Sequence, residues 1–181
     1  MQARRGLCKD ILPLLGIMLC MGSAGLRAQE ESAEETQYRE DYDRTQKIVA
    51  ISDPVKRADQ LITFIKERPN SKLIDYAQAH LFQVLDTLVK SENAPPLLAL
   101  SDRFIKLRPR VGETYYFYGS GLKIERRFPE AMDALAKCYV LRNRISNKAK
   151  EFLEYIYKGQ HQGSLVGLDK IIKKAQDEVG K

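Results

Sequence analysis

Apolar residues recur at helical spacing along most of the chain, with charged residues between them. Within 73–90, one stripe is formed at three-residue intervals by Tyr76, Ala79, Phe82 and Leu85. The same kind of pattern predicts eight helices in four hairpins, over 34–51, 52–66, 73–90, 95–107, 147–158 and 165–179, with two more helices within 113–143. The expected fold class is all-α.

Residues suited to helix N-termini stand before several of these segments. Asp53 is expected to cap the second helix, with Pro54 in its first turn, and Pro95 opens the fourth helix. Ser146 and Ser164 are expected to cap the last two helices. The first helix is expected to have one side made of Tyr38, Tyr42, Ile48 and Val49.

A hexapeptide occurs twice with one difference, as "FIKERP" at Phe64–Pro69 and "FIKLRP" at Phe104–Pro109. A degenerate third copy, "CYVLRN", follows at Cys138–Asn143. In the first two copies the Phe is expected to face inward and the Pro to stop the helix. Arg68 and Arg108 would lie in the last turn, where the helix dipole favours a cation. The hexapeptide therefore predicts a structural helix terminator rather than a catalytic loop.

The spacing between repeats is 40 residues and then 34, and a further 34 leads to Ile172. Ala79 and Gly119 are 40 apart, whereas Pro95 and Pro129 are 34 apart, so the six extra residues lie between Ala79 and Pro95. A longer helix end or loop is tolerated at such a place.

A period of 34 is typical of the tetratricopeptide repeat, a helix-turn-helix unit. The segment 113–143 resembles this family through Tyr115, Tyr118, Gly119, Leu122, Phe128, Ala131, Leu135 and Cys138. Small residues are needed where two helices cross closely, a role expected of Gly119 and Ala131. The resemblance implies a right-handed superhelix of about four antiparallel helix pairs over 34–181, with atypical terminal pairs.

The first 28 residues have the pattern of a secretory signal peptide. A basic start precedes the apolar stretch Ile11–Leu26, and small residues follow up to Ala28. A short acidic linker is expected over 29–33. The protein would then be exported, to the periplasm or outside the cell. An uncleaved anchor, or lipidation at Cys20, would instead associate it with a membrane, although Leu19 fits a lipidation box poorly.

Export changes the interpretation of charge and cysteine content. Four basic residues and one acidic residue precede position 29, so the net charge falls from +6 to +3 without them. Most basic clusters have acidic neighbours, which argues against nucleic-acid binding. Cys138 would be the only remaining cysteine, so no internal disulfide is expected.

No catalytic, cofactor or metal site is expected. The two histidines, His80 and His161, are not at metal-ligand spacing from other ligand residues, and no phosphate-binding loop or HExxH motif occurs. His161 is expected on a surface turn. Cys138 stands where the repeat family has a small inward residue, so it is expected to be buried and structural. The sequence therefore favours a protein that is not an enzyme.

The family resemblance also implies a binding surface on the first helix of each pair. The positions that would face a partner are Tyr76, His80, Gln83, Tyr116, Ser120 and Lys123. Aromatic and polar side chains of this kind suit another protein or an extended peptide. The alternative is that Tyr76 and Tyr116 are half-buried residues between repeats.

These observations favour an exported, non-catalytic protein-interaction scaffold of the cell envelope. Leu100–Leu122 and Glu67–Leu85 also resemble the tetratricopeptide lipoproteins of the outer-membrane β-barrel assembly machinery, which would imply an envelope-assembly factor. Two other hypotheses remain open. One is an accessory subunit that docks a separate enzyme. The other is self-assembly through the terminal helices, around Tyr155 and Tyr157.

Overall fold

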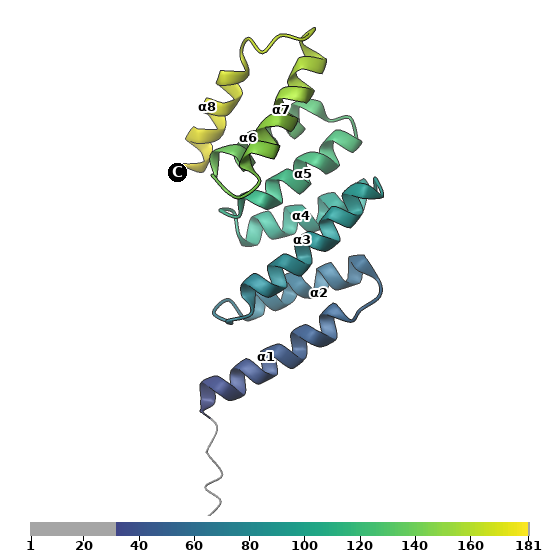
Figure 1. The fold of residues 1–181 in the computed structure, drawn as a ribbon, viewed down its shortest axis with the longest axis vertical. Coiled ribbons are helices and arrows are strands. Elements are labelled where there is room, and N and C mark those ends of the chain that lie inside the picture. The colour runs from purple at the N-terminus through teal and green to yellow at the C-terminus, as the bar shows by residue number, and fades with distance from the viewer. Residues whose placement is uncertain (1–31, 181) are drawn as a thin grey trace, which may run out of the picture. The chain divides into compact units, whose positions relative to one another are not determined.

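The computed structural model describes residues 32–180, which contain eight α-helices and no β-strand (Figure 1). The all-α prediction is confirmed for this range. The predicted signal peptide and the first part of the predicted linker, up to residue 31, lie outside the described residues. The helices are α1 (Ala33–Val49), α2 (Pro54–Glu67), α3 (Ile74–Lys90), α4 (Ala94–Leu107), α5 (Gly112–Ile124), α6 (Phe128–Val140), α7 (Ser146–Gln160) and α8 (Leu168–Val179).

Each helix from α1 to α6 packs against the next one in the chain, and helices two apart also meet (Figure 1). These second-neighbour contacts join α2 to α4, α3 to α5, α5 to α7 and α6 to α8. The apolar interior has two parts: one is formed mainly by α2, α3 and α4, and the other by α5 to α8. No helix within residues 32–180 is long and apolar enough to cross a membrane.

Helix α5 comes very close to both of its neighbours. A Cβ atom added to Gly119 would lie 3.0 Å from Cγ of Leu135 and 3.2 Å from the carbonyl oxygen of Ala131, both on α6. The predicted small-residue crossing is therefore confirmed. The sequence reasoning did not single out Gly121, where an added Cβ would lie 2.9 Å from Cδ2 of Leu98 on α4.

The repeated hexapeptide ends α2 and α4 as predicted. Phe64 and Phe104 are fully buried, and the backbone N–H groups of Arg68 and Arg108 donate to the Phe64 and Phe104 carbonyls at 2.9 and 2.8 Å. The two arginines also reach back to the first helix of their own pair. Arg68 Nη1 donates to Gln37 Oε1 at 3.0 Å, and Arg108 makes a longer bond of 3.5 Å to Oε1 of Gln78.

The third copy of the hexapeptide ends α6 by a different route. Arg142 takes a left-handed conformation with φ 47°, and Asn143 stands where the other copies have Pro. The Asn143 side chain donates to the Cys138 carbonyl at 2.7 Å and accepts from the Ile145 backbone N–H at 2.9 Å. The Asn143 amide thus satisfies a backbone carbonyl group at the end of α6. In the first two copies of the hexapeptide, proline stops the helix instead.

The predicted stripe on α3 is wrong in its first half. Phe82 and Leu85 are buried, but Tyr76 and Ala79 are exposed. An α-helix turns by about 100° per residue, so positions three apart drift by roughly 60° at each step. Over three steps the stripe therefore passes from one side of the helix to the other. The core side of α3 is instead formed by Ile74, Ala77, Leu81, Val84, Leu85 and Leu88.

The six additional residues of the first repeat interval extend α3 and the loop before it. α3 has 17 residues where α5 has 13, and their last residues, Lys90 and Ile124, are 34 positions apart. The remaining difference lies in the longer connection between α2 and α3. The prediction that all six lie between Ala79 and Pro95 is wrong, because part of them lengthens the connection before α3, and the connection after α3 is no longer than the one after α5.

One predicted cap is confirmed and two are wrong. The Asp53 side chain accepts from the Lys56 backbone N–H at 3.0 Å, with Pro54 as the first residue of α2. Ser146 lies inside α7, and its hydroxyl accepts from the Asn143 N–H at 2.7 Å. Ser164 precedes α8 by several residues, because a turn intervenes in which Gly167 has φ 96°.

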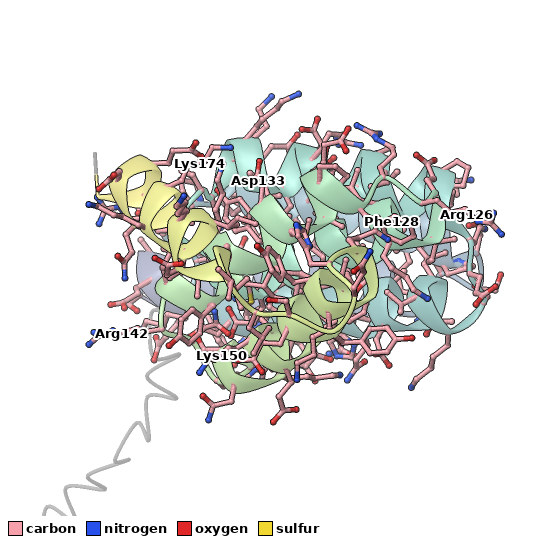
Figure 2. The ribbon with its side chains drawn as sticks, turned by 90° about the horizontal axis from the view of Figure 1, so that it is seen from above. Arg126, Phe128, Asp133, Arg142, Lys150 and Lys174 are labelled. Atoms are coloured by element: carbon pink, nitrogen blue, oxygen red, sulfur yellow. The ribbon has the colours of Figure 1, made fainter. Side chains whose placement is uncertain are left out.

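Helix α1 packs on α2 largely through polar groups. Its buried residues are Asp41, Thr45 and Ile48, so of the four residues assigned to one side only Ile48 is buried. The Asp41 carboxylate is 3.5 Å from Arg68 Nε and accepts from Gln37 Nε2 at 2.9 Å. At the other end of the chain, Lys174 of α8 pairs with Asp133 of α6 at 2.8 Å (Figure 2).

Replacing Gly119 with Leu should lower the free energy of unfolding by about 1–3 kcal/mol, because the larger side chain overpacks the crossing between α5 and α6. The matched control is Gly159→Leu on α7, where an added Cβ meets nothing within 4 Å. That variant should be as stable as the parent or up to about 1 kcal/mol more stable, because glycine disfavours helix. Urea unfolding measures both. Equal losses in the two variants would contradict the close crossing.

The two arginines of the hexapeptide provide a second matched pair. Arg68→Ala should destabilise the docking of α1 by about 1–3 kcal/mol, because the buried Asp41 carboxylate loses a charged partner. Arg108→Ala removes a single long hydrogen bond and should cost about 0.5 kcal/mol or less. Hydrogen exchange of the α1 amides measures the effect. Unchanged protection of α1 in the Arg68 variant would contradict it.

Candidate functional site

Three of the predicted partner-binding residues lie on α3. Tyr76 is 37% exposed, and the edge of its ring meets the ring of His80 at a centroid distance of 4.5 Å. The Tyr76 hydroxyl accepts from Gln46 Nε2 of α1 at 3.3 Å. His80 is half-buried and Gln83 is exposed. The spacing of 76, 80 and 83 places the three side chains on one face of the helix.

The other three predicted residues lie on α5 and differ in exposure. Tyr116 and Lys123 are half-buried. Ser120 is buried, and its hydroxyl donates to the Tyr116 carbonyl within the same helix at 2.8 Å. Its side chain is therefore turned into the protein and is not presented to a partner.

The structure brings these two groups onto neighbouring helices. α3 packs against α5, and the Phe82 and Phe117 rings meet between them at 5.5 Å. Tyr76 directly precedes the buried Ala77 of α3, and Tyr116 directly precedes the buried Phe117 of α5. The structure therefore presents the predicted residues, apart from Ser120, on two adjoining helices.

Helix α7 adds residues that the sequence reasoning did not assign to this surface. The Phe152 ring lies 6.0 Å from the Tyr116 ring and 6.5 Å from the Tyr155 ring. We call Tyr116, Phe152 and Tyr155 the aromatic track. Tyr155 is 69% exposed, and Lys148 places its ammonium group 4.8 Å from the centre of the Tyr116 ring. Aromatic residues at 152 and 155, one helical turn apart, were the available signal.

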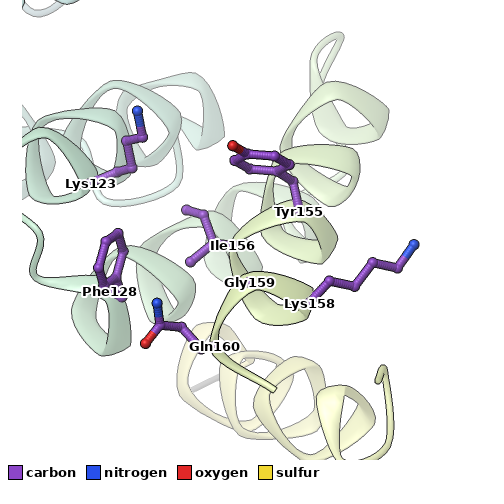
Figure 3. Close-up of a pocket in the computed structure, with 7 residues that line it drawn as sticks. All are labelled: Lys123, Phe128, Tyr155, Ile156, Lys158, Gly159 and Gln160. Carbon is purple, nitrogen blue, oxygen red and sulfur yellow. The ribbon is translucent and has the colours of Figure 1, made fainter. Parts of the chain in front are cut away.

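A pocket of about 490 Å³ lies at the Tyr155 end of this track. Ile156 lies between Phe128 on one side and Tyr155 on the other, and Lys123 borders the opening (Figure 3). We call this the α7 pocket, lined by Lys123, Phe128, Tyr155, Ile156, Lys158, Gly159 and Gln160. Lys123 is thus a predicted site residue that borders this pocket.

No group of three or more metal-ligating side chains occurs between residues 32 and 180. His161 is exposed at the end of α7, where its ring stacks on Tyr157 and contacts the Tyr157 carbonyl at 2.9 Å. The expected surface-turn position of His161 is confirmed.

Cys138 is fully buried, as expected from the sequence. Burial raises the pKa of its thiol to about 11, although a weak contact with Asn143 Nδ2 opposes the shift. A thiol is a nucleophile only when it is deprotonated, so the raised pKa and the burial of Cys138 both disfavour its reaction in the folded chain.

Comparisons of the chain with protein-family models, with curated proteins and with solved structures returned no match.

The state of Cys138 can be tested by alkylation with iodoacetamide at mildly alkaline pH. Because its pKa is raised well above the pH of the experiment and its sulfur is buried, Cys138 should stay unmodified in the folded protein and react in denaturing urea. Mass spectrometry of tryptic peptides distinguishes it from Cys8 and Cys20. Rapid labelling of Cys138 without denaturant would contradict its burial.

Proposed function

We propose that this chain is a non-catalytic protein-interaction scaffold of the tetratricopeptide kind. The contacts between successive and second-neighbour helices, the repeated helix terminators and the close crossing at Gly119 support the repeat architecture. Its handedness and its assignment to that family follow from the sequence resemblance. The predicted signal segment makes the cell envelope the proposed location.

The observation that carries the proposal is the set of partly exposed aromatic and polar side chains on the adjoining helices α3 and α5. Tyr76 and Tyr116 offer rigid aromatic area, whereas Gln83 and Lys123 offer hydrogen-bond donors. Such a surface suits a protein segment, because aromatic anchors contribute most of the binding energy at interfaces. The proposed partner is another protein or an extended peptide.

The partner would serve either as a component of an envelope-assembly process or as an enzyme that this chain docks. The two roles predict different companions. The first predicts association with outer-membrane β-barrel proteins, and the second predicts stable association with one enzyme.

Affinity purification of the chain from membranes and periplasm tests the proposal. The variant Tyr76→Ala/Lys123→Ala changes one surface residue on each of α3 and α5. The control Lys66→Ala/Lys170→Ala changes two exposed residues on α2 and α8. Surface changes of this kind should each alter stability by about 0.5 kcal/mol or less, so all three proteins should fold.

A partner retained by the parent and the control, and lost by the α3/α5 variant, is the expected result. Its identity by mass spectrometry would then assign the process. An identical partner set for all three proteins would show that binding does not use this surface and would overturn the proposal.

A further inference from the structure

The aromatic track has a spacing that matches an extended polypeptide. Its two steps, from Tyr116 to Phe152 and from Phe152 to Tyr155, measure 6.0 and 6.5 Å between ring centroids. In an extended strand, side chains on the same side recur at about 6.6 Å. Alternate side chains of a bound extended segment would therefore meet successive rings of the track.

The α7 pocket continues the track beyond Tyr155. Tyr155 belongs to both, and the pocket then opens over Ile156 towards Phe128 (Figure 3). Its volume of about 490 Å³ accommodates a large apolar side chain. A series of three neighbouring rings, the last of which borders a pocket, suits a chain better than a compact small molecule, which would use the pocket alone.

The charges around the track and the pocket are predominantly basic and lack carboxylate partners. Lys123, Lys148 and Lys158 form no ion pair with any residue in the described part of the chain. Other lysines nearby in the chain are paired, as Lys150 of α7 is with Glu154 and Lys137 of α6 is with Glu178.

Further basic charge lies next to the pocket at the turn between α5 and α6. Arg126, which has a left-handed conformation with φ 60°, is close to Phe128 in the chain and lies on the same side of the view in Figure 2. On α7, Glu151 is an exposed carboxylate one turn before Tyr155. Glu154 is paired with Lys150, and Glu125 and Glu130 are paired with Arg127. Glu151 is thus outnumbered by the three lysines without an ion pair, so the surface favours an anionic ligand.

We propose that the aromatic track and the α7 pocket bind an extended acidic segment of a partner protein. The segment has apolar side chains at alternate positions, and the last of these enters the pocket over Ile156. Carboxylates at the intervening positions point away from the rings and are reached by the long, flexible side chains of Lys123 and Lys148. This inference rests on the proposed scaffold function and specifies which partner segment the scaffold recognises.

Binding of fluorescent synthetic peptides to the full chain, followed by fluorescence anisotropy, tests the inference. The first peptide alternates aromatic residues with Glu. The second has the same aromatic positions with Lys in place of Glu. The third has the composition of the first, with its aromatic residues grouped together. The first should bind at least about tenfold more tightly than either other peptide, because it alone matches both spacing and charge.

Two variants connect this preference to the site. Tyr155→Ala removes the most exposed ring of the track, and Lys123→Glu reverses a charge at the pocket. Each should weaken binding of the first peptide by about tenfold or more, as expected for a hot-spot residue. The matched controls are Tyr38→Ala on α1 and Lys170→Glu on α8, both at exposed positions. They should change the affinity by less than about twofold.

Equal affinity for the first and second peptides would overturn the acidic preference, and equal affinity for the first and third would overturn the alternating spacing. Loss of binding in the Tyr38 or Lys170 control as large as in the site variants would also overturn the inference. If no peptide binds while purified partners still depend on Tyr76 and Lys123, this inference fails and the scaffold function stands. If no peptide binds and no purified partner depends on Tyr76 and Lys123, both this inference and the proposed scaffold function fail.

Discussion

The close approach of α5 to both α4 and α6 is the constraint on which the rest of the helical domain depends. Gly121 lets α5 approach Leu98 of α4, and Gly119 lets it approach Leu135 of α6. α5 also joins the two parts of the core, because Phe117 belongs to one and Leu122 to the other. The glycines are two residues apart, so one stretch of helix fixes the distances to both neighbours. The helices that carry the candidate site are positioned by this contact.

The features that could be predicted from the sequence are those that depend on local residues. A buried Phe, a terminal Arg and a following Pro are sufficient to end a helix, and both hexapeptides do so. The end of the third copy was less predictable, since Asn143 replaces proline by hydrogen bonding rather than by steric exclusion. The prediction for Ser164 was wrong because a serine before an apolar run can stabilise a turn as well as cap a helix. Its hydroxyl accepts a hydrogen bond from the Val166 N–H within the turn.

The candidate site was predictable only in part, because exposure depends on which neighbours a helix meets. The face of α3 with Tyr76 and Gln83 is exposed, whereas the matching face of α5 is partly covered. Ser120 satisfies its hydroxyl within its own helix, which allows it to be buried there. The contribution of α7 could not be read from the repeat pattern, since Phe152 reaches Tyr116 only through the packing of helices two apart.

The two ends of the helical domain differ in a way that bears on binding. α1 is attached mainly by polar contacts around Asp41, so it has little apolar burial to resist local opening. α5 and α7 belong instead to a core with fully buried residues such as Leu122 and Leu153. The helix backbones that carry the three rings are therefore held in place before any partner arrives. A preformed surface loses less conformational entropy on binding, so a short segment can be recognised by a few rings and charges there. The close packing that makes α5 intolerant of larger side chains thus also favours the α5–α7 face, rather than α1, as the binding surface.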